Sequence, residues 1–171
     1  MTKGIVHVCA LATMPHIVAS SRAGHLISLI NAEMLPATPP HLAPERHMKL
    51  VMNDIAAPRE GLIPPGVSHV EQLIAFVQYW DRQAPLVVHC WAGISRSSAA
   101  AYIAMATLRP DADEFELARS LRAASPTATP NQRLVALADA SLGRDGRMIR
   151  AIAAIGRGAS AFEGAPYILE C

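Results

Sequence analysis

The sequence predicts an α/β fold in which helices flank a central, mostly parallel sheet. Four short apolar segments, near residues 4–9, 25–30, 48–53 and 85–89, are typical of buried strands. Helical patterns lie between them, and strands that alternate with helices are joined by crossovers into parallel sheets. The last of these segments passes through a short loop into an Ala-rich helix, which is the strand-loop-helix order of such sheets.

In the first half of the chain, residue spacing predicts two helices and a loop. The segment near 4–9 contains His7 and is interpreted as an internal first strand, not as a secretory leader. A helix that ends near Gly24 follows it. Residues 34–47 are rich in Pro and His, so we expect a loop there. From 67 to 80 apolar residues recur at helical spacing, which predicts an amphipathic helix.

The second half of the chain contains four predicted helices. The first covers residues 97–108 and is stopped by a proline. Asp111 and Glu114 predict a capping box at the start of the next one. A third begins after Pro130, and a last amphipathic helix around 148–152 is expected to cover the core.

The composition indicates one domain over residues 1–171, with a Gly- and Ala-rich tail after about 156 that we expect to be loosely held. Hydrophobic residues make up 51% of the chain and charged residues 17%, which argues against disorder.

No apolar run approaches the roughly 20 residues that span a bilayer. The net charge of +1 offers no broad basic surface, so we expect neither nucleic acid nor a membrane as a partner. Three widely spaced cysteines are typical of a reducing compartment, which predicts a cytoplasmic protein.

The most informative segment, residues 89–98, reads His-Cys-Trp-Ala-Gly-Ile-Ser-Arg-Ser-Ser. Five residues separate Cys90 from Arg96, after an apolar strand and before a helix. A loop that turns from strand into helix can point several backbone N–H groups at one spot, and the helix adds the positive end of its dipole. An oxyanion would bind there, and the same field favours the thiolate form of the cysteine.

Each residue type in this loop has a chemical use. The planar fork of Arg96 can grip two phosphate oxygens and spread the charge that develops during phosphoryl transfer. Gly93 suits a turn that needs a positive φ or a close approach by substrate, and Ser97 is placed to donate a hydrogen bond to the sulfur as it leaves. The expected substrate-binding residues are those of the loop: Trp91, Ala92, Gly93, Ile94, Ser95 and Arg96.

The string His-Cys-x-x-Gly-x-x-Arg-Ser resembles the signature of the cysteine-based protein tyrosine phosphatases, and Ala-Gly-Ile-Ser-Arg-Ser resembles their dual-specificity branch. The likeness extends from about residue 24 to residue 139. Residues 24–31 are similar to the family's early strand, Asn53 and Asp54 to its general-acid loop, and Thr129-Pro130-Asn131 to a block that opens a later helix, which gives Asn131 a supporting role.

This resemblance implies a hydrolase of phosphomonoesters, either a protein tyrosine phosphatase or a dual-specificity-like enzyme, which forms a cysteinyl-phosphate intermediate on Cys90. The substrate would be a phosphorylated protein or a small phosphomonoester. Nucleophile, acid and charge clamp would all come from the protein, so no cofactor is expected. The seven histidines show no metal-ligand spacing, and no metal site is expected either.

The general acid is expected on the loop after the third strand. Such an enzyme needs a group that protonates the leaving oxygen and later activates water. Asp54 follows an apolar strand and lies in a Pro- and Gly-containing segment, so we interpret it as catalytic, although Asp is also common as a turn cap. Glu60, farther along the loop, is the second candidate. The chain lacks the Trp-Pro-Asp triplet of the classical tyrosine phosphatases.

Two neighbours of the loop have more than one interpretation. Cys90 could be a buried small hydrophobe, but it ends a parallel strand, where catalytic groups of such sheets lie. His89 could be a general base. In the family the corresponding residue orients the loop by hydrogen bonding, and we favour that support role.

The substrate is less well defined by the sequence. Residues 91–95 contain no lysine, whereas loops of the phosphoinositide-directed relatives tend to carry added positive charge, so a singly phosphorylated head group is favoured. Trp91 could flank an aromatic ring at the rim or serve only in packing. Three helical arginines, Arg119, Arg122 and Arg133, could engage groups beside the phosphate but are more simply interpreted as solvated.

Three other functions are compatible with an anion-binding cysteine loop. A rhodanese-type sulfurtransferase usually has a shorter interval between cysteine and arginine. An arsenate reductase needs a resolving thiol, for which Cys9 is the one candidate, and its strand position gives no reason to place it near Cys90. A non-catalytic phosphoprotein-binding module is disfavoured because Cys90, Arg96 and Asp54 are all present.

Overall fold

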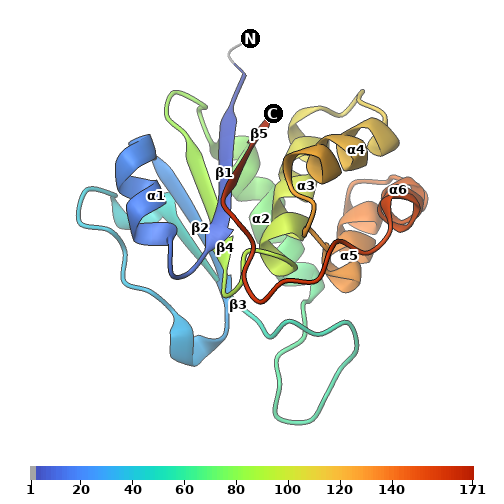
Figure 1. The fold of residues 1–171 in the computed structure, drawn as a ribbon, viewed down its shortest axis with the longest axis horizontal. Helices are drawn as coiled ribbons and strands as arrows, with labels where there is room; N and C mark the ends of the chain where they lie inside the picture. Colours follow the sequence, from blue (N-terminus) through green and yellow to red (C-terminus); the bar gives the residue numbers. More distant parts are fainter. Residues whose placement is uncertain (1–2) are drawn as a thin grey trace.

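The protein is a five-stranded sheet with helices on both faces, seen in a computed structural model that describes residues 3–171 (Figure 1). The strands follow the order β3-β2-β4-β1-β5. Four of them are parallel, and β5 pairs with β1 in the antiparallel direction. Their bounds are Ile5–Ala10 for β1, His25–Ile30 for β2, His47–Val51 for β3, Leu86–Cys90 for β4 and Tyr167–Glu170 for β5.

The predicted α/β class with a mostly parallel sheet is confirmed. The four predicted strands lie within two residues of the observed bounds. Every residue of β2 and β4 is buried, as the continuous apolar runs indicated, because both strands lie inside the sheet with a layer of helix on each face.

The helices cover the two faces unequally, as Figure 1 shows. Helix α1 (Met14–Ser21) packs on one face beside β1 and β4, over a small cluster around Cys9 and Val87. The main core lies on the other face, beneath α2 to α6. The bounds of these helices are Val67–Tyr79 for α2, Arg96–Leu108 for α3, Glu114–Ala124 for α4, Gln132–Ser141 for α5 and Arg147–Ile155 for α6.

Helix α3 is the central helix of that layer, since 11 of its 13 residues are buried. Its run of small alanines lets the surrounding helices α2, α4 and α5 approach it closely. The predicted loop at 34–47 is an irregular connection with two short 3₁₀ turns, Ala32–Met34 and Pro44–Arg46. Helix α6 buries Met148 and Ile152 and so covers the core as predicted.

Two local predictions are wrong. The N-cap of α4 is Asp113, not Asp111, because the Asp113 side chain accepts hydrogen bonds from the N–H groups of residues 115 and 116. The tail after residue 156 ends in strand β5, which the sequence analysis missed. Tyr167 and Cys171 are buried and β5 is paired along β1, so the last residues are packed and not loosely held.

The sheet determines where chemistry can occur. The parallel strands β2, β3 and β4 run side by side in the same direction, so their carboxyl ends meet at one edge. Asn31 follows β2, Asp54 follows β3 after a short link, and Cys90 ends β4. Parallel sheets hold their ligands at this edge.

Candidate active site

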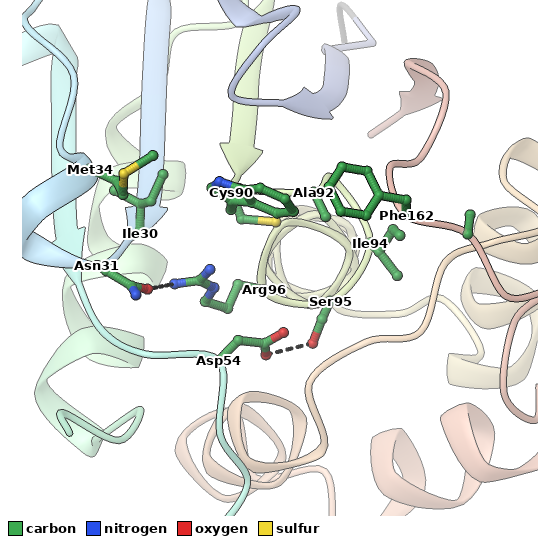
Figure 2. A pocket seen from close by; sticks show the side chains of 12 residues that line it. Ile30, Asn31, Met34, Asp54, Cys90, Ala92, Ile94, Ser95, Arg96 and Phe162 are labelled. Atoms are coloured by element: carbon green, nitrogen blue, oxygen red, sulfur yellow. Dashed lines mark hydrogen bonds between the residues drawn. The ribbon is translucent and has the colours of Figure 1, made fainter.

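A pocket of about 500 Å³ opens at the carboxyl ends of β2, β3 and β4. Figure 2 shows its lining side chains, with Asn31 meeting Arg96 and Asp54 meeting Ser95 along the two dashed lines. The pocket therefore joins the predicted nucleophile and cation of one loop with the predicted acid from a distant part of the sequence. Its lining residues are Ile30, Asn31, Met34, Asp54, Cys90, Trp91, Ala92, Ile94, Ser95, Arg96, Ala161 and Phe162.

The Cys90 sulfur lies at the bottom of this pocket, and its residue is only 3% exposed. The backbone N–H of Gly93 donates to Sγ at 3.2 Å. The hydroxyl of Ser97 lies 3.1 Å from the same sulfur and can donate to it. Two donors aimed at one sulfur would stabilise negative charge on it.

The loop between Cys90 and Arg96 is held from outside by its carbonyl groups. Four of its carbonyls accept hydrogen bonds from backbone N–H groups of surrounding segments: Trp91 O from Leu11 at 3.1 Å, Ala92 O from Gly164 at 2.8 Å, Ile94 O from Thr129 at 3.0 Å and Ser95 O from Asn131 at 3.2 Å. In a trans peptide the C=O and the following N–H point in opposite directions. The N–H groups of Ala92, Gly93, Ser95 and Arg96 therefore face inward, and among residues 3–171 those of Ala92 and Ser95 have no acceptor. Such a ring of free N–H groups binds anions.

Gly93 makes this conformation possible. Its φ is +70°, a region that disfavours side chains. A Cβ atom there would lie 2.8 Å from the backbone nitrogen of Ala10 and from the carbonyl carbon of Cys9. Both the turn and the close approach to β1 thus require glycine.

Arg96 is a buried cation without a carboxylate partner. Its Nη1 donates to Asn31 Oδ1 and to the carbonyl of Met52, both at 2.7 Å. The residue is 5% exposed, and in the part of the chain that the structure describes its buried Nε has no acceptor and no ion pair forms. One end of the guanidinium is fixed, and the edge that carries Nε is left for an anion.

Asp54 is held against the loop by two donors. Its Oδ1 accepts from the Ser95 hydroxyl at 2.7 Å and from Asn131 Nδ2 at 2.9 Å. Asn131 also caps α5, where its own Oδ1 accepts from the N–H of Leu134 at 3.0 Å. The second candidate acid, Glu60, is exposed and is not among the residues that line the pocket.

The chain is similar to known phosphatases in sequence and in fold. The protein-tyrosine phosphatase family model matches residues 58–133, a segment that contains Cys90 and Arg96 but not Asp54. No curated protein matches the sequence significantly. The resemblance to the cysteine-based protein tyrosine phosphatases is confirmed. The sequence of this segment and the fold of the chain support a protein-tyrosine-phosphatase-like cysteine phosphatase.

The fold is shared with solved structures of dual-specificity phosphatases. The structure of DUSP15 is 18% identical, with a TM-score of 0.60 over 91% of this chain and 94% of that one. Human DUSP28 is 17% identical, with a TM-score of 0.60 over 81% and 92%. PTPMT1 in complex with PI(5)P is 12% identical, with a TM-score of 0.60 over 88% and 93%. At these identities the likeness establishes the fold alone.

His89 hydrogen-bonds to the backbone of Cys90 and not to its sulfur. Its Nδ1 lies 3.1 Å from the carbonyl of Cys90, and its Nε2 lies 2.6 Å from the Ser28 hydroxyl. Burial lowers the pKa of His89 to about 4, so the ring is neutral at physiological pH. These contacts are those of a group that orients the start of the loop.

The hydrogen bonds behind His89 have a defined direction. A neutral ring that donates from Nδ1 to a carbonyl must accept at Nε2, so Ser28 donates to His89. Ser28 then accepts from Nε2 of His47, 2.8 Å away, and Nδ1 of His47 accepts from Thr38 at 2.9 Å. This buried chain connects β2, β3 and β4 behind the pocket, and no pattern in the sequence predicted it.

Cys9 is closer to the site than the sequence indicated. Strands β1 and β4 are neighbours, and Cys9 is paired with His89. Its residue is 1% exposed in the cluster under α1, and burial raises the pKa of the Cys9 thiol to about 12. A thiol in this state is a poor resolving group.

The three helical arginines have structural partners. Arg122 donates to backbone carbonyls at Ser125, Pro126, Ala128 and Gly156. Arg133 donates to a carbonyl at position 65, and Arg119 pairs with Glu116. None of them lines the pocket beside Cys90.

Several pocket residues were not identified from the sequence. Asn31 could have been, because it follows a parallel strand just as Asp54 does. Met34 and Phe162 carry no comparable signal. In the described range 3–171 no group of three or more potential ligands could hold a metal ion, and no helix is long and apolar enough to cross a membrane.

Proposed function

We propose that this chain hydrolyses phosphomonoesters by a two-step reaction through a phosphorylated Cys90. The observation that carries the proposal is the pocket above the sulfur, where free loop N–H groups and the unpaired edge of a buried Arg96 converge. A buried cation without a counter-ion is costly unless a ligand supplies the charge. An oxyanion such as the phosphate dianion supplies it.

In the first step the Cys90 thiolate attacks phosphorus as the bond to the leaving oxygen breaks. Asp54 donates its proton to that oxygen, so an alcohol or phenol departs. Arg96 and the loop N–H groups stabilise the charge on the three equatorial oxygens. The products of this step are a cysteinyl phosphate and an Asp54 carboxylate.

In the second step water attacks the cysteinyl phosphate. The Asp54 carboxylate accepts a proton from the water, the S–P bond breaks, and inorganic phosphate and the thiolate are released. The hydroxyl of Ser97, 3.1 Å from Sγ, stabilises the departing sulfur. The reaction needs no cofactor, since every group comes from the chain.

Ser95 and Asn131 are positioning residues for Asp54. Both of their hydrogen bonds reach Oδ1, which leaves Oδ2 free to carry the transferred proton. Asn131 also donates to the carbonyl of Ile55 at 3.2 Å, so it ties the acid loop to the start of α5. This geometry supports Asp54 rather than Glu60 as the acid.

We infer that the substrate is a phosphorylated protein or a small phosphomonoester and that residues 1–171 act as one cytoplasmic domain. Arsenate reduction is less well supported, because the candidate resolving thiol, Cys9, is buried in a strand cluster. Sulfur transfer is less well supported, because loops of the rhodanese type usually have a shorter interval between cysteine and arginine than the one from Cys90 to Arg96. A purely binding role is less well supported because Asp54 lies in the same pocket as Cys90 and Arg96.

The decisive experiment follows turnover and the intermediate together. Phosphotyrosine, phosphoserine and phosphoinositide substrates should be tested beside thiosulfate and arsenate, with orthovanadate as inhibitor. We expect vanadate-sensitive release of phosphate, a phosphocysteine trapped by rapid quenching, and no turnover by Cys90→Ser or Cys90→Ala. Turnover of thiosulfate or arsenate without any phosphomonoester would overturn the proposal.

The acid is tested with Asp54→Asn on a phosphotyrosine peptide. We expect kcat to fall by about 10²- to 10³-fold, since general acid catalysis contributes that order of magnitude. Glu60→Gln is the matched control and should retain kcat within about twofold. Full activity of Asp54→Asn on the peptide would remove this residue from the mechanism.

A further inference from the structure

The tail between α6 and β5 is attached to the catalytic loop by its backbone. Arg122 Nη2 donates to the carbonyl of Gly156 at 2.8 Å. The N–H of Ala159 donates to the carbonyl of Pro126 at 2.8 Å. The N–H of Gly164 donates to the carbonyl of Ala92, inside the loop, at 2.8 Å. The segment is thus fixed on both sides of residues 160–163.

Glycine allows this close attachment at two points. A Cβ at Gly158 would lie 2.6 Å from the carbonyl carbon of Thr127, and a Cβ at Gly164 would lie 3.0 Å from the carbonyl oxygen of Gly93. The tail backbone therefore packs directly against the backbone beside and within the loop. The five residues between the two glycines, 159–163, therefore have a defined position.

One of these five residues, Phe162, projects at the mouth of the pocket. Its side chain is 82% exposed although the surrounding backbone is anchored. The ring packs edge to face on Trp91, with centroids 5.2 Å apart and an interplanar angle of 83°. Figure 2 shows Phe162 beside Ala92 and across the pocket from Met34. A fixed and exposed phenyl ring has little value for the core, so its position at the mouth needs another explanation.

We propose that Phe162, together with Trp91, forms a binding site for the aromatic ring of an aryl phosphomonoester such as phosphotyrosine. This inference rests on the proposed function, because it needs a phosphate held above Cys90. Aromatic rings gain energy from offset-stacked and edge-to-face contact with each other beyond the area they bury. An aliphatic phosphoserine is too short and lacks a ring to make that contact.

A lipid surface is the other class of partner that exposed aromatic residues suggest. The geometry favours a small ring, because Trp91 and Phe162 line the pocket itself and pack on each other. The chain has only two lysines, so no cluster of lysines adjoins them for anionic lipid. Vesicle binding is therefore an outcome of the test and not part of the proposal.

The test compares Phe162→Ala with Phe162→Tyr, which keeps the ring. For a phosphotyrosine peptide we expect Phe162→Ala to raise KM about fivefold with kcat within about twofold, a loss typical of one aromatic contact. The phosphoserine version of the same peptide should show no change in KM. Phe162→Tyr should restore the wild-type value. Tyr79→Ala, which removes another exposed aromatic far from the pocket lining, is the matched control.

A binding measurement separates this inference from the proposed function. In the Cys90→Ser background, calorimetry with phosphotyrosine should show about fivefold weaker binding on adding Phe162→Ala, with inorganic phosphate binding unchanged. Equal loss for both ligands, or no loss for phosphotyrosine, would overturn the aromatic site while leaving the phosphate site intact. Loss of vesicle binding alone would assign Phe162 to a membrane contact and also overturn it. Absence of phosphate binding in every variant would instead refute the proposed function.

Discussion

Two buried arginines lie at opposite ends of the same helix, and only one of them is neutralised. Arg96 is the first residue of α3, and Arg144 packs against its end. They are 5% and 7% exposed. The helix dipole favours a cation at its carboxyl end and disfavours one at its amino end. Arg96 is therefore in the less favourable position, with no charged partner to compensate.

The partners of the two guanidinium groups differ in kind. Arg144 donates to Glu114 Oε1 at 3.0 Å and to the carbonyls of Ala106 and Pro110, each at 2.8 Å. These carbonyls belong to the end of α3 and the turn after it. Arg96 reaches only an amide oxygen and a carbonyl, and its Nε has no acceptor among residues 3–171. A buried cation that has no charged partner in the fold, and that keeps an unpaired donor, indicates a binding site for an anionic ligand.

Substitution of Arg96, at the start of α3, should have the largest effect, and this effect should be on catalysis. Arg96→Met should lower kcat/KM by about 10³-fold or more, since an arginine that stabilises a transferring phosphoryl group contributes on that order. The free energy of unfolding should stay equal or rise, because an uncompensated buried charge is removed. Steady-state kinetics and urea unfolding measure the two quantities. A large loss of stability without a loss of kcat/KM would reverse the interpretation.

Substitution of Arg144, which packs against the end of α3, should lower stability and leave catalysis unchanged. Arg144→Met should lower the free energy of unfolding by about 3 kcal/mol, because Glu114 then loses its buried partner. The kcat of the folded fraction should stay within about twofold. The double variant Glu114→Gln/Arg144→Met is the control and should recover part of the loss. Equal losses in the single and double variants would show that the unpaired Glu114 carboxylate is not what destabilises Arg144→Met, and would contradict this expectation.

The two arginines should also differ in how much their substitution changes the stabilisation of the protein by a bound anion. Orthovanadate at about 100 times its Kd should stabilise the wild type by about 2.7 kcal/mol, as linkage requires for a ligand of the folded state. Arg144→Met should gain the same amount from its lower baseline, and Arg96→Met should gain little. Thermal unfolding with and without vanadate measures the gain. Equal stabilisation of Arg96→Met would place the anion elsewhere.

The sequence predicted one end of this comparison far better than the other. Cys90 and Arg96 were identified because their spacing and the flanking strand and helix are local properties. Asp54 was identified from its place after a strand, and the same rule would have found Asn31. Glu114 and Arg144 look like ordinary surface charges in the sequence, since their burial depends on how α3, α4 and the turn before α6 pack.

The tail could not be predicted for a related reason. Strand β5 has four residues in a half-exposed pattern at the sheet edge, which is too short and too polar a signal. Phe162 reaches the pocket only because Gly158 and Gly164 dock on distant segments. Such docking is a tertiary property, and a Gly- and Ala-rich composition alone is typical of a flexible tail.

The smallest expected effect is a pH dependence at the neutralised end. Burial raises the pKa of Glu114, but hydrogen bonds from its own backbone N–H and from Arg147, with the charges of Arg147 and Arg144, outweigh this and hold it below the usual range. A lowered pKa in the folded state stabilises the protein above the unfolded pKa of about 4.3, and that stability is lost as pH falls through the folded value.

Urea unfolding between about pH 3 and pH 6 should therefore show a fall in stability at the acid end that is smaller in Glu114→Gln than in the wild type. Arg96→Met should keep the wild-type acid dependence, because no carboxylate pairs with Arg96 in the described chain. A flattened acid limb in Arg96→Met would mean that a carboxylate depends on this arginine after all. The difference between the two ends of α3 would then be one of degree and not of kind.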